Sequence, residues 1–155
     1  MTNRIQLFLI TILFIFIEQN INAQSITNLQ YLSQVGVLDS LYSQTLKESR
    51  DIYIQLPESY NPENNQKYPV VYILDGELFL PTVSNVQHFY SGGFTPEMVL
   101  VGISNSKNRT RDLTTSTIKT SYGMPFNQDN GEAANFMTFL EKELIPFIEN
   151  KYPVT

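Results

Sequence analysis

An apolar run closed by an acidic residue and a glycine most constrains the fold of this 155-residue chain. Val70–Leu74 holds five consecutive apolar residues, mostly β-branched or aromatic, and Asp75-Gly76-Glu77 follows directly. Such a run is typical of a strand that is buried on both faces, as in the parallel centre of an α/β sheet. Residues 98–103 have the same character and predict a second buried strand.

Two alternating segments precede this run. Residues 39–47 and 50–56 alternate between polar and apolar side chains, which predicts two antiparallel strands joined by a turn at residues 48–49. In the second of these segments, one face would carry Ile52, Ile54 and Leu56, and the other Asp51, Tyr53 and Gln55.

Helical periodicity appears in two later segments. Residues 79–90 predict a short helix, and residues 132–150 predict a longer one because their apolar residues recur at spacings of three and four. Pro146 lacks a backbone N–H, so we expect a kink or a new start near Leu144. Residues 105–131 show no periodicity and predict a long loop of a kind that is often functional.

This order of elements predicts the fold class. Two antiparallel strands followed by strand, helix, strand, loop and helix indicate an α/β sheet with antiparallel N-terminal strands and parallel central strands, incomplete at the C-terminus. The alternation of strands and helices argues against a β-sandwich adhesive domain.

Residues 1–23 have the features of a bacterial-type signal peptide. Arg4 supplies positive charge, residues 7–17 are almost entirely apolar, and Ala23 is a small residue at the expected cleavage point. The apolar stretch is shorter than the roughly 20 residues that a membrane-spanning helix needs. We therefore expect export to the periplasm or the exterior, with no membrane span after cleavage; an N-terminal membrane anchor is the alternative.

Composition excludes several classes of function. The net charge is −5 and the pI is about 4.8, which disfavours nucleic-acid binding. The chain has no cysteine and one histidine, so we expect no metal site, and nothing in the sequence calls for a cofactor.

Several separate motifs between residues 40 and 152 together resemble a known family. They occur in one order along the chain: Arg50 with Leu56-Pro57-Glu58-Ser59-Tyr60, then Tyr68 to Gly76, Pro96 to Ile103, Arg109 to Thr114, and Glu143 to Glu149. This series is similar to the serine esterases of the esterase D and enterochelin-esterase branch of the α/β-hydrolases. The resemblance is specific for the fold and the superfamily, and it does not specify the substrate.

The resemblance implies a serine nucleophile in a G-x-S-x-G elbow, followed later in the chain by an acid and a histidine. The elbow would come about ten residues after Tyr152, and no G-x-S-x-G occurs in the sequence. We therefore assign no catalytic residue in this chain. Residues 24–155 would form the N-terminal part of a carboxylic-ester hydrolase, inactive alone, that acts on a small-molecule ester. A non-catalytic binding module derived from a hydrolase is the alternative.

The turn after the buried strand is the predicted first half of an oxyanion hole. An ester hydrolase needs a backbone N–H aimed at the developing negative charge, held at the carboxyl end of a buried strand. Asp75 and Gly76 would shape this turn, and the N–H of Glu77 would be the donor. An ordinary strand-ending turn is the alternative.

Three further residues need an interpretation. The resemblance places Arg111 and Asp112 beside the catalytic cleft, where Arg111 could orient a substrate anion. In the alternative, which we favour, the two residues form ion pairs that hold the long loop in place. His88 does not follow an acid late in the chain, so we expect it at the surface or at the edge of the core rather than as a catalytic base.

Overall fold

The computed structural model of the protein describes residues 36–155. Within them, four strands form a mixed sheet in the order β1-β2-β4-β3. Strands β1 (Val37–Ser43) and β2 (Glu48–Gln55) are antiparallel, and β2 is antiparallel to β4 (Val99–Ile103). Strand β3 (Val70–Leu74) runs parallel to β4. The predicted α/β sheet is confirmed, while the predicted signal peptide lies outside the described residues.

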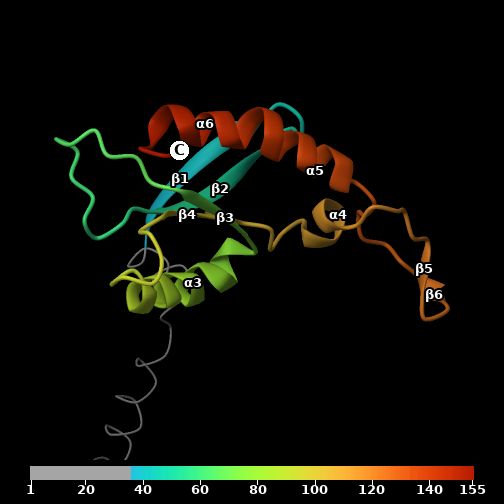
Figure 1. Ribbon diagram of the computed structural model, residues 1–155. Helices are drawn as coiled ribbons and strands as arrows, with labels where there is room; N and C mark the ends of the chain where they lie inside the picture. Colours follow the sequence, from blue (N-terminus) through green and yellow to red (C-terminus); the bar gives the residue numbers. More distant parts are fainter. Residues whose placement is uncertain (1–35) are drawn as a thin grey trace, which may run out of the picture.

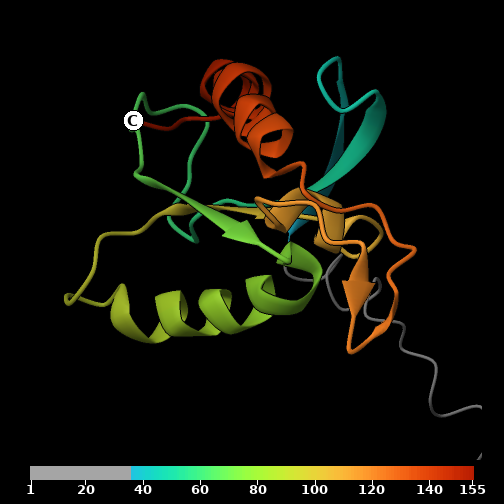
Figure 2. The same ribbon diagram turned by 90° about the vertical axis from the view of Figure 1, so that its right-hand side faces the viewer.

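Helices cover both faces of this sheet (Figures 1 and 2). On one face lies α3 (Gly76–Tyr90), and on the other lies a continuous helical segment made of α5 (Ala133–Phe139), the π-helical stretch η1 (Leu140–Leu144) and α6 (Ile145–Lys151). The sheet is therefore the middle layer of three. The helix α4 (Arg109–Leu113) and the small hairpin of β5 (Thr120–Ser121) and β6 (Met124–Pro125) lie beyond one end of the sheet.

Two apolar clusters correspond to the two faces. The larger lies under α5 and α6 and includes Ile52, Val101 and Phe136, and the smaller lies under α3 and includes Tyr53 and Leu80. Strand β2 is therefore covered on both faces: Ile52 and Ile54 lie in the larger cluster, and Tyr53, on the opposite face, is buried under α3. All five residues of β4 are buried, as predicted for a central strand.

The burial of β3 was overestimated from the sequence. Among its residues Ile73 is buried and Leu74 is exposed, because β3 is an edge strand of the described sheet. A parallel bridge joins Tyr68, just before β3, to Val154. The N–H of Tyr68 donates to Pro153 O at 2.9 Å, whereas Pro69 O accepts from Val99 N. The edge of β3 that faces away from β4 is therefore approached by the backbone around Val154, which pairs with Tyr68.

Several boundaries differ from the prediction. Strand β1 ends at Ser43 and the turn occupies residues 44–47, because the carboxylate of Glu143 accepts hydrogen bonds from the N–H groups of Gln44 and Thr45. The long loop contains α4 and the β5–β6 hairpin, elements too short to produce a periodic pattern.

The predicted irregularity near Pro146 takes the form of a π-helical turn. A proline inside an α-helix removes a hydrogen bond, and its ring collides with the carbonyl four residues earlier. The wider turn at Leu140–Leu144 directly precedes Ile145-Pro146, and α6 then continues with ordinary geometry.

Replacing Phe139 with alanine is expected to lower the free energy of unfolding by about 3–5 kcal/mol, because its fully buried ring fills the core under α5. Met137 in the same helix is 60% exposed, so Met137→Ala should change stability by less than about 0.5 kcal/mol. Urea denaturation of the two variants measures the difference, and equal unfolding midpoints would contradict this packing of α5.

Candidate active site

The turn between β3 and α3 lies at the carboxyl end of the parallel pair β3–β4. Asp75 adopts a left-handed conformation (φ 50°, ψ 45°) and caps α3. Its carbonyl oxygen accepts hydrogen bonds from Leu78 N at 2.8 Å and from Phe79 N at 3.0 Å. These bonds begin the helix at Gly76, three residues before the start predicted from periodicity, so the turn and the helix form one unit.

A close backbone contact explains the glycine that follows. A Cβ atom on Gly76 would lie 2.4 Å from the carbonyl carbon of Gly102 in β4. No side chain fits at that distance from a backbone, so only glycine allows α3 to start against the sheet. The left-handed residue of the turn is Asp75, and Gly76 is needed for packing.

The first N–H groups of α3 have no hydrogen-bond partner in the described part of the chain. No hydrogen bond from the N–H of Gly76 or Glu77 is present within residues 36–155, and Gly76 itself is buried. The first turn of a helix carries unpaired donors and partial positive charge, which favours an anion. The role of the Glu77 N–H as an oxyanion donor stays a prediction.

An open pocket of about 410 Å³ lies beside this turn. Its lining combines apolar and charged side chains, from Asp75, Glu77, Leu78, Phe79, Ser106 and Arg109. Arg109 Nε donates to both carboxylate oxygens of Asp75, at 2.9 and 3.1 Å, and its side chain is 63% exposed. The sequence reasoning missed Arg109, although it lies two residues from Arg111 in the same short helix.

Arg111 and Asp112 do not line that pocket. The Arg111 guanidinium donates to Glu48 Oε1 at 2.7 Å and Oε2 at 3.0 Å, and its Nε donates to Asp112 Oδ1 at 2.9 Å. Hydrogen bonding to Glu48 raises the pKa of Arg111, and the same contact lowers the pKa of Glu48. These contacts fit the alternative in which Arg111 and Asp112 form ion pairs that hold the loop after β4 in place.

A buried arginine, Arg50, forms a charged cluster together with Glu48, Arg111 and Asp112. Arg50 is 4% exposed, and its guanidinium lies 2.7 Å from Asp112 Oδ2 and donates to Ser104 O at 2.9 Å. It also stacks 5.7 Å from the ring centroid of Phe136. Arg50 therefore connects β2 to the end of β4, to α4 and to α5.

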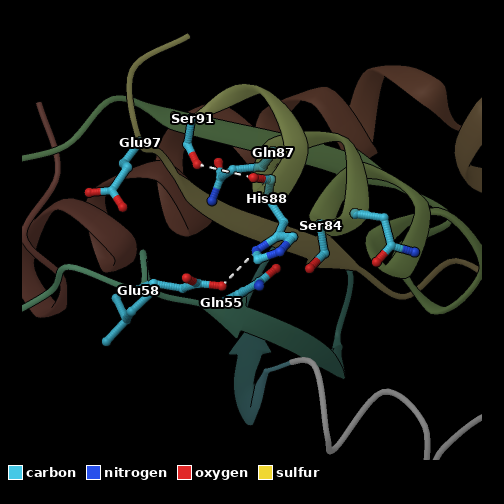
Figure 3. A pocket seen from close by; sticks show the side chains of 9 residues that line it. Gln55, Glu58, Ser84, Gln87, His88, Ser91 and Glu97 are labelled. Atoms are coloured by element: carbon cyan, nitrogen blue, oxygen red, sulfur yellow. Dashed lines mark hydrogen bonds and ion pairs between the residues drawn. The ribbon is translucent and has the colours of Figure 1, made fainter. Parts of the chain in front are cut away.

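His88 lies in a separate polar pocket near the C-terminal half of α3 (Figure 3). Its Nδ1 lies 2.9 Å from Glu58 Oε1, and the side chain is 65% exposed. In the described part of the chain, no hydrogen bond joins the His88 ring to a serine hydroxyl; Ser91 Oγ contacts the His88 carbonyl instead. The position agrees with a surface histidine.

Within residues 36–155, no group of three or more His, Cys, Asp or Glu side chains could hold a metal ion. No helix of that region is long and apolar enough to cross a membrane.

Comparison with known proteins places the chain in a family. Residues 43–155 match the family model described as "Putative esterase", and the chain belongs to this family. Among curated sequences, none matches the chain significantly.

Solved structures agree with this assignment. An IroE-like serine hydrolase from Shewanella oneidensis is 37% identical with a TM-score of 0.68, and the match covers 77% of this chain and 39% of that one. The BES protein from Bacillus cereus is 26% identical with a TM-score of 0.62, and the match covers 77% of this chain and 50% of that one. The siderophore hydrolase EstA from Aspergillus nidulans, at 21% identity and a TM-score of 0.62, shares the fold over 78% of this chain and 46% of its own. This chain spans half or less of the length of these structures.

Replacing Arg111 with glutamine is expected to lower the free energy of unfolding at pH 7 by about 1–3 kcal/mol, because Glu48 and Asp112 lose one of their two arginine partners and keep only Arg50. A carboxylate whose pKa is lowered by folding stabilises the protein above its unfolded pKa, and this contribution disappears as the pH falls through the folded-state value. The cost of R111Q should therefore shrink below about pH 4, as measured by urea denaturation.

The exposed pair of Lys142 and Glu141 provides the control, since both side chains are about two-thirds exposed. Lys142→Gln should change stability by less than about 0.5 kcal/mol at either pH. If R111Q costs no more than K142Q, or its cost does not depend on pH, the charged cluster does not hold the loop.

Proposed function

We propose that this chain is the N-terminal part of an exported carboxylic-ester hydrolase whose Ser-Asp/Glu-His triad lies beyond Thr155. The observation that carries the proposal is that the N–H groups of Gly76 and Glu77, at the carboxyl end of a parallel strand, have no hydrogen-bond partner within residues 36–155. Membership of the esterase family supports the same reaction class. The described residues supply the site that would stabilise charge, and the attacking group would come from the following segment.

The strand register supports this arrangement. Tyr68 pairs with Val154 in parallel, and Leu74 follows Tyr68 by six residues. A strand that continued from Val154 in this register for six residues would end level with Leu74. A sharp turn there would bring its first residue next to Glu77, where a nucleophile elbow is required.

In the proposed reaction, a serine hydroxyl attacks the ester carbonyl and a histidine accepts its proton. The carbonyl oxygen becomes negatively charged in the tetrahedral intermediate. It would accept a hydrogen bond from Glu77 N–H and a second from the N–H of the residue after the nucleophile. The pocket formed by Leu78, Phe79 and Arg109 lies where one side of the ester would bind.

The substrate is proposed as a small-molecule ester, because the chain belongs to a family described as esterases and the IroE-like relative is described as a serine hydrolase. Export is proposed from the signal-peptide features of residues 1–23. A net charge of −5 does not favour a nucleic-acid partner.

The first test is hydrolysis of p-nitrophenyl acetate by the protein translated from the complete reading frame. A downstream G-x-S-x-G together with measurable turnover supports the proposal. If the frame lacks a nucleophile and the protein has no turnover, the esterase function is rejected in favour of the non-catalytic binding module.

Glu77→Pro is expected to lower kcat of the complete enzyme about 100- to 1000-fold relative to Glu77→Ala, because proline removes the N–H that would stabilise the oxyanion. Proline is tolerated in the first turn of a helix, where the N–H has no intrahelical acceptor. Glu77→Ala keeps the N–H and removes the same carboxylate, so the ratio of the two variants isolates the donor. Equal kcat values for the two folded variants would remove Glu77 from the oxyanion hole.

A further inference from the structure

Asn105 is a fully buried polar residue two positions after the end of β4. Both ends of its amide are hydrogen-bonded. Its Oδ1 accepts from Asp75 N at 3.1 Å, and its Nδ2 donates to Asp112 Oδ2 at 3.3 Å. Asn105 therefore connects the candidate oxyanion turn to the buried charged cluster.

The orientation of this amide follows from its partners. The backbone N–H of Asp75 can only donate, and an ionised carboxylate such as Asp112 can only accept. One orientation alone satisfies both, with Oδ1 toward Asp75 and Nδ2 toward Asp112. Asp112 is in turn held by Arg50 and Arg111, at 2.7 and 2.8 Å.

The turn needs such an anchor because Asp75 has a left-handed backbone, which costs a residue with a side chain on the order of 1 kcal/mol. Rotation of the Asp75 backbone would redirect the N–H groups of Gly76 and Glu77. A second contact holds the same region: the Glu77 carboxylate accepts from Ser106 N at 2.6 Å and from Asn105 N at 3.3 Å. The loop after β4 and the turn after β3 are thus locked together.

We infer that Asn105 is a positioning residue for ester hydrolysis: its side-chain amide fixes the Asp75–Gly76 turn so that the Glu77 N–H points to the oxyanion. This inference rests on the proposed function. Asn105 touches no substrate and acts through the turn.

The test uses the complete enzyme with p-nitrophenyl acetate, and circular dichroism confirms that each variant is folded. Asn105→Ala should lower kcat by about 10-fold or more while KM changes less than about twofold, because a misdirected donor weakens binding of the transition state more than binding of the substrate. Asn108→Ala is the matched control. Its Nδ2 donates to Glu48 of the same charged cluster and it makes no hydrogen bond to the turn, so its kcat should stay within about twofold of the wild type.

A donor–acceptor exchange tests the hydrogen-bond logic. Asn105→Asp alone places two carboxylates in contact and should also lower kcat. In the double variant N105D/D112N, the carboxylate at position 105 accepts hydrogen bonds from Asp75 N–H and from the amide at position 112. Arg50 keeps Glu48 as an acceptor. It should recover part of the kcat lost in N105D, whereas a purely structural role predicts a further loss.

A readout without catalysis separates this inference from the proposed function. Hydrogen exchange followed by NMR should show a protected Asp75 amide in the wild type and in N108A, and faster exchange in N105A. If the wild type has no esterase turnover, the proposed function fails and the positioning of the turn by Asn105 is still decided by exchange. Unchanged protection of Asp75 in folded N105A, or kcat values for N105A and N108A that agree within twofold, would overturn the inference.

Discussion

The contact between the backbones of Gly76 and Gly102 sets the geometry of this half of the sheet. It allows the first turn of α3 to rest directly on β4, with a distance that no side chain permits. Because β3 and β4 are parallel, their carboxyl ends lie side by side at this point. The turn of Asp75 and the loop of Asn105 are neighbours for that reason, and a hydrogen bond from Asp75 N to Asn105 joins them.

Charge around the turn is arranged in two layers. Arg109 and Asp75 are paired near the surface beside the pocket, where water weakens their attraction. Arg50 and Asp112 are paired in the interior, where an unpaired charge would be costly. The outer pair is partly exposed through Arg109, whereas the inner pair gives the loop a buried support. Asn105 joins the two layers without carrying a charge itself.

The sequence predicted the parts of the fold that depend on local pattern. The apolar runs of β3 and β4 and the turn at Asp75 follow from residues adjacent in the chain. Contacts between distant segments could not be read in this way. Arg111 finds its partner Glu48 63 residues earlier, and Asn105 finds Asp75 30 residues earlier. Dependence on distant segments also explains why the burial of β3 was overestimated: its five apolar residues do not indicate which strands lie beside it.

The π-helical turn has a consequence for how the long helix tolerates change in length. Its inward side chains are Phe136, Phe139, Leu144 and Ile148, with a step of five residues in the middle where an α-helix would use three or four. The wide turn absorbs one surplus residue and returns Leu144 to the side that faces the sheet. A homologue with one residue fewer between positions 140 and 143 would therefore form a regular α-helix here and still present the same four groups inward. In an alignment, a single gap at this place marks a change of helix type and leaves the core intact.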